Sequence, residues 1–198
     1  SNWYWLPKIY KNDCDFFFES KSDLSPGEDD FVTLEKIEST SFKEPFFAYV
    51  HLMSAHIMGK KQEEFKKYLP DKIGLSNDKK EALINNYDNG ILQVDHIIKK
   101  IFDKFRKDGQ LEHSTIFILS DHGELFGEDG RWKYAGSLHP DLQSIPMFIY
   151  DQDKSWYQNT YAATLLDIAP TIADRLGYDI PECWDGVSLH DTLRNFKI

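Results

Sequence analysis

The stretch TIFILSDHG, residues 115–123, sets an apolar run of strand length directly before a polar turn. The run is rich in β-branched and aromatic side chains and therefore predicts a buried strand. Runs at 46–50 and 146–150 have the same character, so we expect three such strands. The turn at the end of the first stretch places Asp121 beside His122, and a carboxylate next to an imidazole at a strand exit calls for a chemical reason.

Helical periodicity accounts for much of the remaining chain. Apolar residues every three or four positions predict a long helix from about 77 or 78 to 107, and shorter helices at 29–39, 161–176 and near 189–196. Apolar strands that alternate with helices indicate an α/β fold with a mostly parallel sheet covered by helices on both faces. Ligands of such sheets bind at the carboxyl ends of the strands, where residues 51–56 and 121–122 are expected.

Size and charge limit the class of protein. A chain of 198 residues is long enough for one sizeable α/β domain. The net charge of −10, from 23 basic and 33 acidic residues, argues against a nucleic-acid partner. No apolar stretch approaches the length of about 20 residues that spans a membrane.

Asp121 and His122 suggest a metal site. Each can give one donor atom to a divalent cation, but two ligands are too few, so others must come from elsewhere. The alternative is that Asp121 caps a following helix and that His122 is incidental. The residues alone leave both readings open.

Further segments give these two residues a context. Four groups of segments, in order along the chain, resemble the sulfatase family within the alkaline phosphatase superfamily: PFFAYVHLMSAH at 45–56; YDNGI at 87–91 with Asp95; SDHGELFGEDGRWK at 120–133 with LHP at 138–140 and IPMFI at 145–149; and DIAPTI at 167–172 with Gly177 and DGVSL at 185–189. The resemblance covers about residues 30–190. It implies an alkaline-phosphatase-like α/β fold that is incomplete within this chain.

The resemblance also implies roles for five residues. Asp121 and His122 match metal ligands, and Lys133 matches a lysine directed at the sulfate oxygens. His56 matches a histidine that contacts the sulfate or the leaving oxygen, where it acts as a hydrogen-bond donor or general acid. His139 is expected to contact the sulfuryl or phosphoryl group. The alternatives are that Lys133 is a solvated loop lysine and His139 a loop histidine.

The same resemblance has implications for the cofactor, the substrate and the compartment. The cofactor that it implies is a divalent metal ion, calcium first, with magnesium, manganese or zinc as alternatives. The substrate is a small-molecule or glycan sulfate ester, or else a phosphoester. The family implies a periplasmic or other extracytoplasmic location.

The nucleophile that the family requires does not occur in this sequence. Neither Cys14 nor Cys183 lies in the C/S-x-P-x-R segment that carries it. We therefore expect residues 1–198 to be the carboxy-terminal portion of one catalytic domain. The amino-terminal portion, with the nucleophile and further acidic ligands, would be its missing partner, and the chain alone would be inactive.

Three readings of the function follow. The first is part of a metal-dependent sulfatase-like hydrolase, a sulfuric ester hydrolase. The second is a phosphoethanolamine or phosphoglycerol transferase, or a phosphoester hydrolase, of the same superfamily; His139 favours it and Lys133 disfavours it. The third is a non-catalytic binding protein that retains the fold.

Overall fold

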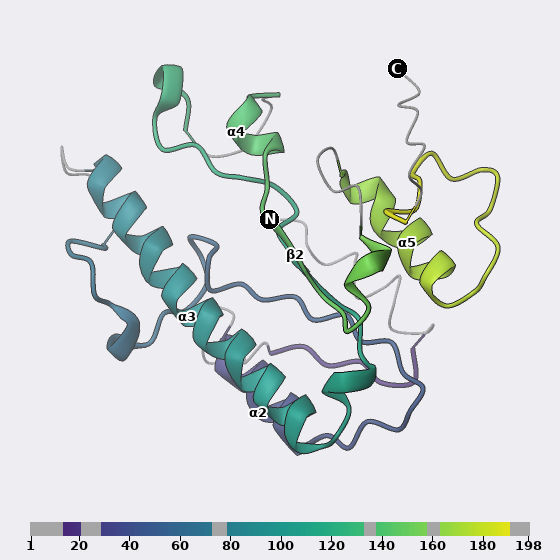
Figure 1. The fold of residues 1–198 in the computed structure, drawn as a ribbon. Helices are drawn as coiled ribbons and strands as arrows, with labels where there is room; N and C mark the ends of the chain where they lie inside the picture. The colour runs from purple at the N-terminus through teal and green to yellow at the C-terminus, as the bar shows by residue number, and fades with distance from the viewer. Residues whose placement is uncertain (1–13, 21–28, 73–78, 133–137, 158–162, 191–198) are drawn as a thin grey trace. The chain divides into compact units, whose positions relative to one another are not determined.

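A computed structural model of the chain describes residues 14–20, 29–72, 79–132, 138–157 and 163–190 (Figure 1). The chain divides into two compact units, residues 1–111 with 126–132, and residues 112–125 with 133–198. The described elements are α2 Asp30–Ser39, η2 Glu63–Phe65, α3 Lys79–Lys107, η3 Leu111–His113, β1 Ile116–Leu119, η4 Glu128–Gly130, α4 Pro140–Gln143, β2 Met147–Tyr150, η5 Lys154–Trp156, η6 Leu165–Asp167 and α5 Ile168–Arg175. Within the described residues, no helix is long and apolar enough to cross a membrane.

The first unit is built on α2 and α3, which pack against each other (Figure 1). The sequence predicts both helices at nearly the observed bounds. Helix α2 begins after Asp29, whose carboxylate accepts a hydrogen bond from the backbone N–H of Phe31 at 3.1 Å. Such a cap satisfies one of the four backbone donors that a helix leaves unpaired at its start. Leu34 and Ile37 form the buried apolar face of α2.

The buried face of α3 is not uniformly apolar. Asn89 and Gln93, one turn apart, are as completely buried as Ile97. The Asn89 side chain accepts hydrogen bonds from the backbone N–H groups of Lys67 and Tyr68 and donates one to the Tyr68 carbonyl, all within 3.0 Å. The backbone at residues 67–68 is thus tied to the long helix.

Gly90 lets the backbone of residues 54–55 lie directly on α3. A Cβ atom at this position would be 2.2 Å from the Ser54 carbonyl oxygen. We expect Gly90→Ala to lower the free energy of unfolding by about 1–3 kcal/mol, because overpacking outweighs the helix propensity gained. Ile91→Ala, at the neighbouring position where the side chain is 42% exposed, is the matched control for chemical denaturation. A Gly90→Ala variant as stable as the wild type would show that this contact is not tight.

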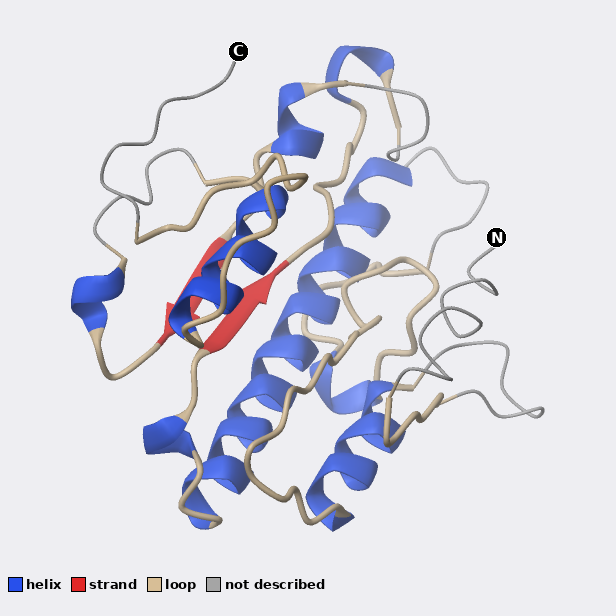
Figure 2. Ribbon diagram, turned by 90° about the vertical axis from the view of Figure 1, so that its right-hand side faces the viewer, coloured by secondary structure: helices blue, strands red, loops and turns tan. Residues whose placement is uncertain are grey.

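Among the residues that the structure describes, both strands belong to the second unit and are drawn in red in Figure 2. β1 and β2 pair in antiparallel register, with Ile116 opposite Tyr150 and Leu119 opposite Met147. The mostly parallel sheet that the sequence predicts is therefore not confirmed. Parallel neighbours need a crossover connection, usually a helix, whereas the described part of the connection holds only the short η4 and α4.

The predicted strand at 46–50 is not formed among the described residues. This segment has no assigned strand pairing, and Phe47 and Tyr49 are 76% and 72% exposed. Phe46 is the exception, because its ring packs against Phe42 and Phe105 at centroid distances of 5.1 and 5.8 Å. Apolar composition predicts a strand only where partner strands lie alongside it, and no described element pairs with this segment.

The start of β1 and the end of β2 meet at a buried carboxylate, that of Asp151. Asp151, which follows β2, accepts hydrogen bonds from Thr115 at 2.6 Å and Tyr157 at 2.8 Å. Arg175 of α5 binds the same carboxylate through two nitrogens, at 3.0 and 3.1 Å. Burial alone would raise the pKa of Asp151, but these hydrogen bonds, with one from the Asp153 backbone, outweigh it and hold the pKa below its usual range.

Hydrogen bonds join the motif at residues 167–172 to the motif at residues 185–189. Asp167 accepts hydrogen bonds from Thr164, which caps η6, and from the backbone N–H of Val187 at 2.9 Å. The Thr171 hydroxyl accepts one from the Leu189 N–H at 3.0 Å. The described α5 is shorter than the predicted 161–176 helix because η6 and its cap precede it. The predicted helix near 189–196 lies almost entirely outside the described residues.

Candidate active site

Asp121 and His122 lie side by side immediately after β1, as the sequence predicts. The Asp121 Oδ1 atom accepts a hydrogen bond from the backbone N–H of His122 at 3.0 Å. His122 Nδ1 lies 2.6 Å from the Gly123 carbonyl oxygen, which only accepts, so Nδ1 is the protonated nitrogen. In the neutral ring the lone pair is then on Nε2. Nε2 lies 3.7 Å from Asp121 Oδ2.

This arrangement suits a pair of metal ligands. Two donor atoms 3.7 Å apart can both reach one cation at the usual distances of about 2.0–2.6 Å. The backbone bonds at Oδ1 and Nδ1 orient the carboxylate and the ring, as outer-shell partners do in metal sites. In the described part of the chain, no group of three or more His, Cys, Asp or Glu side chains is arranged to hold a metal. Asp121 and His122 alone are fewer than the three ligands of such a group.

The turn that carries these residues is fixed against α4. The backbone N–H of Gly123 donates to the Leu142 carbonyl at 2.9 Å. A Cβ atom at position 123 would be 2.0 Å from the Asp141 carbonyl oxygen, so a side chain here would collide with α4. Glycine thus allows the Asp-His turn to dock on the short helix.

His139 begins that short helix. Its Nδ1 atom accepts a hydrogen bond from the Asp141 N–H at 3.2 Å, so the histidine is the N-cap of α4. Only 14% of the side chain is exposed. From the sequence, His139 is either a loop histidine or a residue that contacts the substrate. The structure adds a third role, that of a helix cap. Because Nδ1 accepts, the neutral ring carries its proton on Nε2.

His56 belongs to the first unit. Its Nδ1 accepts a hydrogen bond from the Met58 N–H at 3.1 Å, which places the proton of the neutral imidazole on Nε2. The ring is half-buried. The structure therefore brings Asp121, His122 and His139 into one unit and His56 into the other. Lys133 lies outside the described residues.

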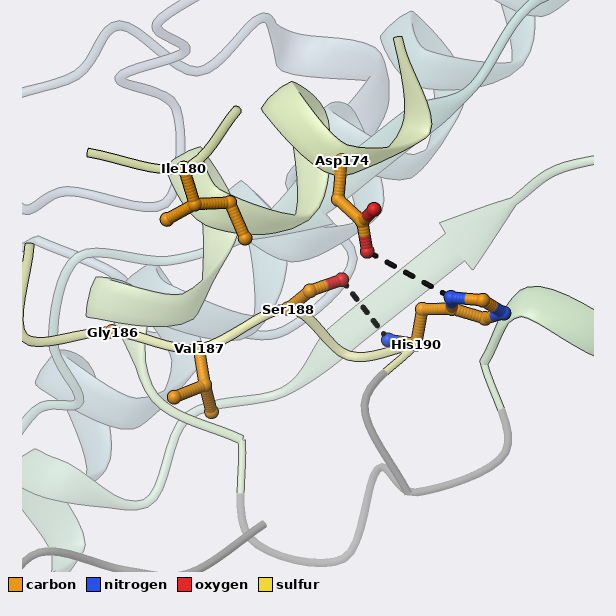
Figure 3. Close-up of a pocket in the computed structure, with 6 residues that line it drawn as sticks. All are labelled: Asp174, Ile180, Gly186, Val187, Ser188 and His190. Atoms are coloured by element: carbon orange, nitrogen blue, oxygen red, sulfur yellow. Dashed lines mark hydrogen bonds and ion pairs between the residues drawn. The ribbon is translucent and has the colours of Figure 1, made fainter. Parts of the chain in front are cut away.

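A separate cavity of about 380 Å³ lies beside α5 (Figure 3). Its lining includes Asp174, Ser188 and His190. His190 Nδ1 is 3.8 Å from Asp174 Oδ2, and the backbone N–H of His190 donates to the Ser188 hydroxyl at 3.2 Å. None of the predicted site residues that the structure describes lines this cavity, so it does not mark the predicted active site.

Comparison with known proteins identifies the family. The family model described as Sulfatase matches residues 1–178, and the chain belongs to the sulfatase family. Phosphoethanolamine transferase EptA of Salmonella typhimurium is 37% identical over 92 residues, which cover 44% of this chain and 17% of that protein. An arylsulfatase of Clostridium perfringens is 30% identical over 112 residues, covering 54% of this chain and 23% of that protein.

A solved structure resembles the fold of this chain as well. It is described as a complex with its substrate D-glucosamine-2-N,6-O-disulfate, and it is 28% identical. Its TM-score is 0.52, over 59% of this chain and 24% of that one. The chain thus spans about a quarter or less of the length of each of these relatives. The family includes both sulfatases and transferases, so membership alone does not fix the reaction.

Proposed function

We propose that this chain forms part of the active site of a metal-dependent sulfatase-like hydrolase that cleaves sulfate esters. The observation that carries the proposal is the oriented pair Asp121 and His122, whose Oδ2 and Nε2 atoms lie 3.7 Å apart in a chain of the sulfatase family. The nucleophile would lie outside these 198 residues, in the amino-terminal portion of the same catalytic domain. The chain alone is then expected to be inactive.

Asp121 and His122 would hold a divalent cation, together with carboxylates from outside this chain. When bound, such an ion stabilises negative charge on the transferring group and activates a nucleophile. We name calcium first on the family resemblance, with magnesium, manganese or zinc as alternatives. Asp121 supplies an oxygen ligand that suits calcium, and His122 a nitrogen ligand that suits zinc.

His56 would donate a hydrogen bond from Nε2 to the ester, at the sulfate or the leaving oxygen. The Met58 N–H bond to Nδ1 supports this role, because it leaves the proton of the neutral imidazole on Nε2. Lys133 would neutralise charge on the sulfate oxygens, and an ammonium group in that place favours the transition state. His139, with its proton on Nε2, would contact the sulfuryl or phosphoryl group.

A sulfated sugar is the substrate class that we propose. The structural relative that binds a glucosamine disulfate supports it. The second candidate is phosphoethanolamine transfer, and the 37% identity to a transferase of this kind favours it, as does His139. The two readings share Asp121 and His122 and differ in the group that is transferred.

The test is to assay the complete protein that includes these residues. We expect kcat/KM for 4-nitrophenyl sulfate to exceed that for 4-nitrophenyl phosphate by at least about tenfold, and N-acetylglucosamine 6-sulfate to release sulfate. As a control, protein treated with a chelator should lose its activity on 4-nitrophenyl sulfate and on N-acetylglucosamine 6-sulfate. Addition of a single kind of divalent metal ion should restore both activities.

The contrary result would be transfer of phosphoethanolamine from a phospholipid to a sugar acceptor, with no release of sulfate from either sulfate ester. That outcome would show that the protein is a phosphoethanolamine transferase and not a sulfatase. Absence of both reactions in metal-loaded protein would favour a non-catalytic role.

A further inference from the structure

The ring of His56 is held by the turn in which it lies. The backbone N–H of His56 donates to the Met53 carbonyl at 3.0 Å, and that of Gly59 donates to the His56 carbonyl at 2.9 Å. The Met58 N–H bond to Nδ1 fixes the ring to the same turn. Residues 53–59, which we call the His56 turn, therefore hold the imidazole through hydrogen bonds within the turn, and whatever anchors the turn also positions Nε2.

Asp30 anchors the beginning of the His56 turn. This residue is 1% exposed, and its carboxylate accepts hydrogen bonds from the Met53 N–H at 2.9 Å and the Ser54 N–H at 2.6 Å. It also accepts a hydrogen bond from the Ser54 hydroxyl at 2.5 Å. Gln93 of α3 donates to the Ser54 hydroxyl at 2.6 Å, so one chain of hydrogen bonds links α2, the turn and α3.

Lys61 anchors the end of the His56 turn. It is 8% exposed, and its Nζ atom donates to the His56 carbonyl oxygen at 2.6 Å. Burial lowers the pKa of Lys61 to about 8, while the charges of Asp30 and Asp71 act in the opposite direction. The amine thus remains largely protonated at neutral pH. Burying a charged group is costly unless it is paired and hydrogen-bonded, and here the bond goes to the backbone of the candidate catalytic residue itself.

We infer that Asp30 and Lys61 are positioning residues, which hold the His56 turn from both ends so that Nε2 of the ring is aimed at the ester oxygen. The inference rests on the proposed function, in which His56 donates to that oxygen. Neither residue needs to touch the substrate. Displacement of a reacting group by about 1 Å can cost about 100-fold in rate, so a buried clamp on the turn has a direct catalytic consequence.

The neighbouring Lys60 provides a matched control. Its side chain is 45% exposed and pairs with Asp29 at 2.6 Å, and so points to the cap of α2 instead of the His56 carbonyl. Lys60→Met and Lys61→Met therefore remove the same group from adjacent positions, and only the second removes a bond to His56. Asp30→Asn tests the other end of the turn with little change in shape.

The experiment uses the complete protein and two aryl sulfates of nearly equal size, 4-nitrophenyl sulfate and phenyl sulfate. Phenolate is the more basic leaving group and depends more on proton donation. We expect His56→Ala, Lys61→Met and Asp30→Asn to raise the ratio of kcat/KM for 4-nitrophenyl sulfate to that for phenyl sulfate by about tenfold, and Lys60→Met to leave it unchanged. This ratio does not depend on the fraction of enzyme that is folded, so lost stability alone does not move it.

Double variants complete the test. If Lys61 acts through His56, Lys61→Met in the His56→Ala background should change the ratio no further. A changed ratio in His56→Ala with wild-type ratios in Lys61→Met and Asp30→Asn would overturn the positioning inference and leave the proposed function standing. An unchanged ratio in His56→Ala would remove the donor role of His56 itself, and the inference with it.

Discussion

Asp121→Ala in the complete protein is expected to lower kcat/KM for sulfate esters by about 1,000-fold or more. The carboxylate is one of the two oriented donors after β1, and its Oδ1 is already fixed by the His122 N–H. Loss of this proposed ligand would remove the several kcal/mol that a correctly held metal contributes to a transition state, and each 1.4 kcal/mol corresponds to about tenfold in rate. Steady-state kinetics and the metal content of the purified variant measure the two sides of this expectation.

Glu112→Ala is the control for Asp121→Ala. Glu112 is an exposed acidic residue of the same unit. The Glu112→Ala substitution therefore removes one negative charge without removing a proposed metal ligand. We expect its kinetics and its metal content to equal those of the wild type. Wild-type turnover in Asp121→Ala would exclude Asp121 from the metal site. Normal metal content with lost turnover would instead assign Asp121 to the chemistry and not to the ion.

The sequence was sufficient where one local rule decides the outcome. Periodicity locates α2 and α3, because a helix with one buried face shows that face in its spacing. The adjacency of Asp121 and His122 at the exit of β1 also follows from the sequence. The role of His139 as a cap does not, because the short α4 that it begins has no periodic pattern to announce it.

The sequence was insufficient where distant residues decide the outcome. The direction of β2 relative to β1 depends on how the 120–146 connection travels, which composition does not encode. Asn89 and Gln93 look like solvated helix residues, but they are buried because they satisfy the backbone of segments about 20 to 30 residues earlier. Asp30 and Lys61 belong to this group, since their partners lie in the His56 turn and only the folded chain reveals them.

The second large effect concerns stability. We expect Asp151→Asn to lower the free energy of unfolding by about 3 kcal/mol, because it removes the charge from a buried carboxylate that pairs with the partly exposed Arg175. The Asp151 side chain is 3% exposed and is bound by Arg175, Thr115 and Tyr157, so the variant leaves several donors without their acceptor. Chemical denaturation at neutral pH measures the loss. Asp103→Ala is the control, since that exposed carboxylate also pairs with cations, Lys99 and Arg106, and its removal should change stability little.

The pH dependence separates the charge of Asp151 from its packing. Its pKa in the folded chain lies below the value of about 3.9 for an unfolded aspartate, so its contribution is fully present above about pH 5. The contribution is lost as the pH falls through the lower, folded pKa, because the carboxylate then becomes protonated. The difference in unfolding free energy between wild type and Asp151→Asn should therefore be constant near neutral pH and shrink in acid. A difference that stays constant down to the acid limit of the folded state would show that the shape of the side chain, and not its charge, joins the ends of β1 and β2 to α5.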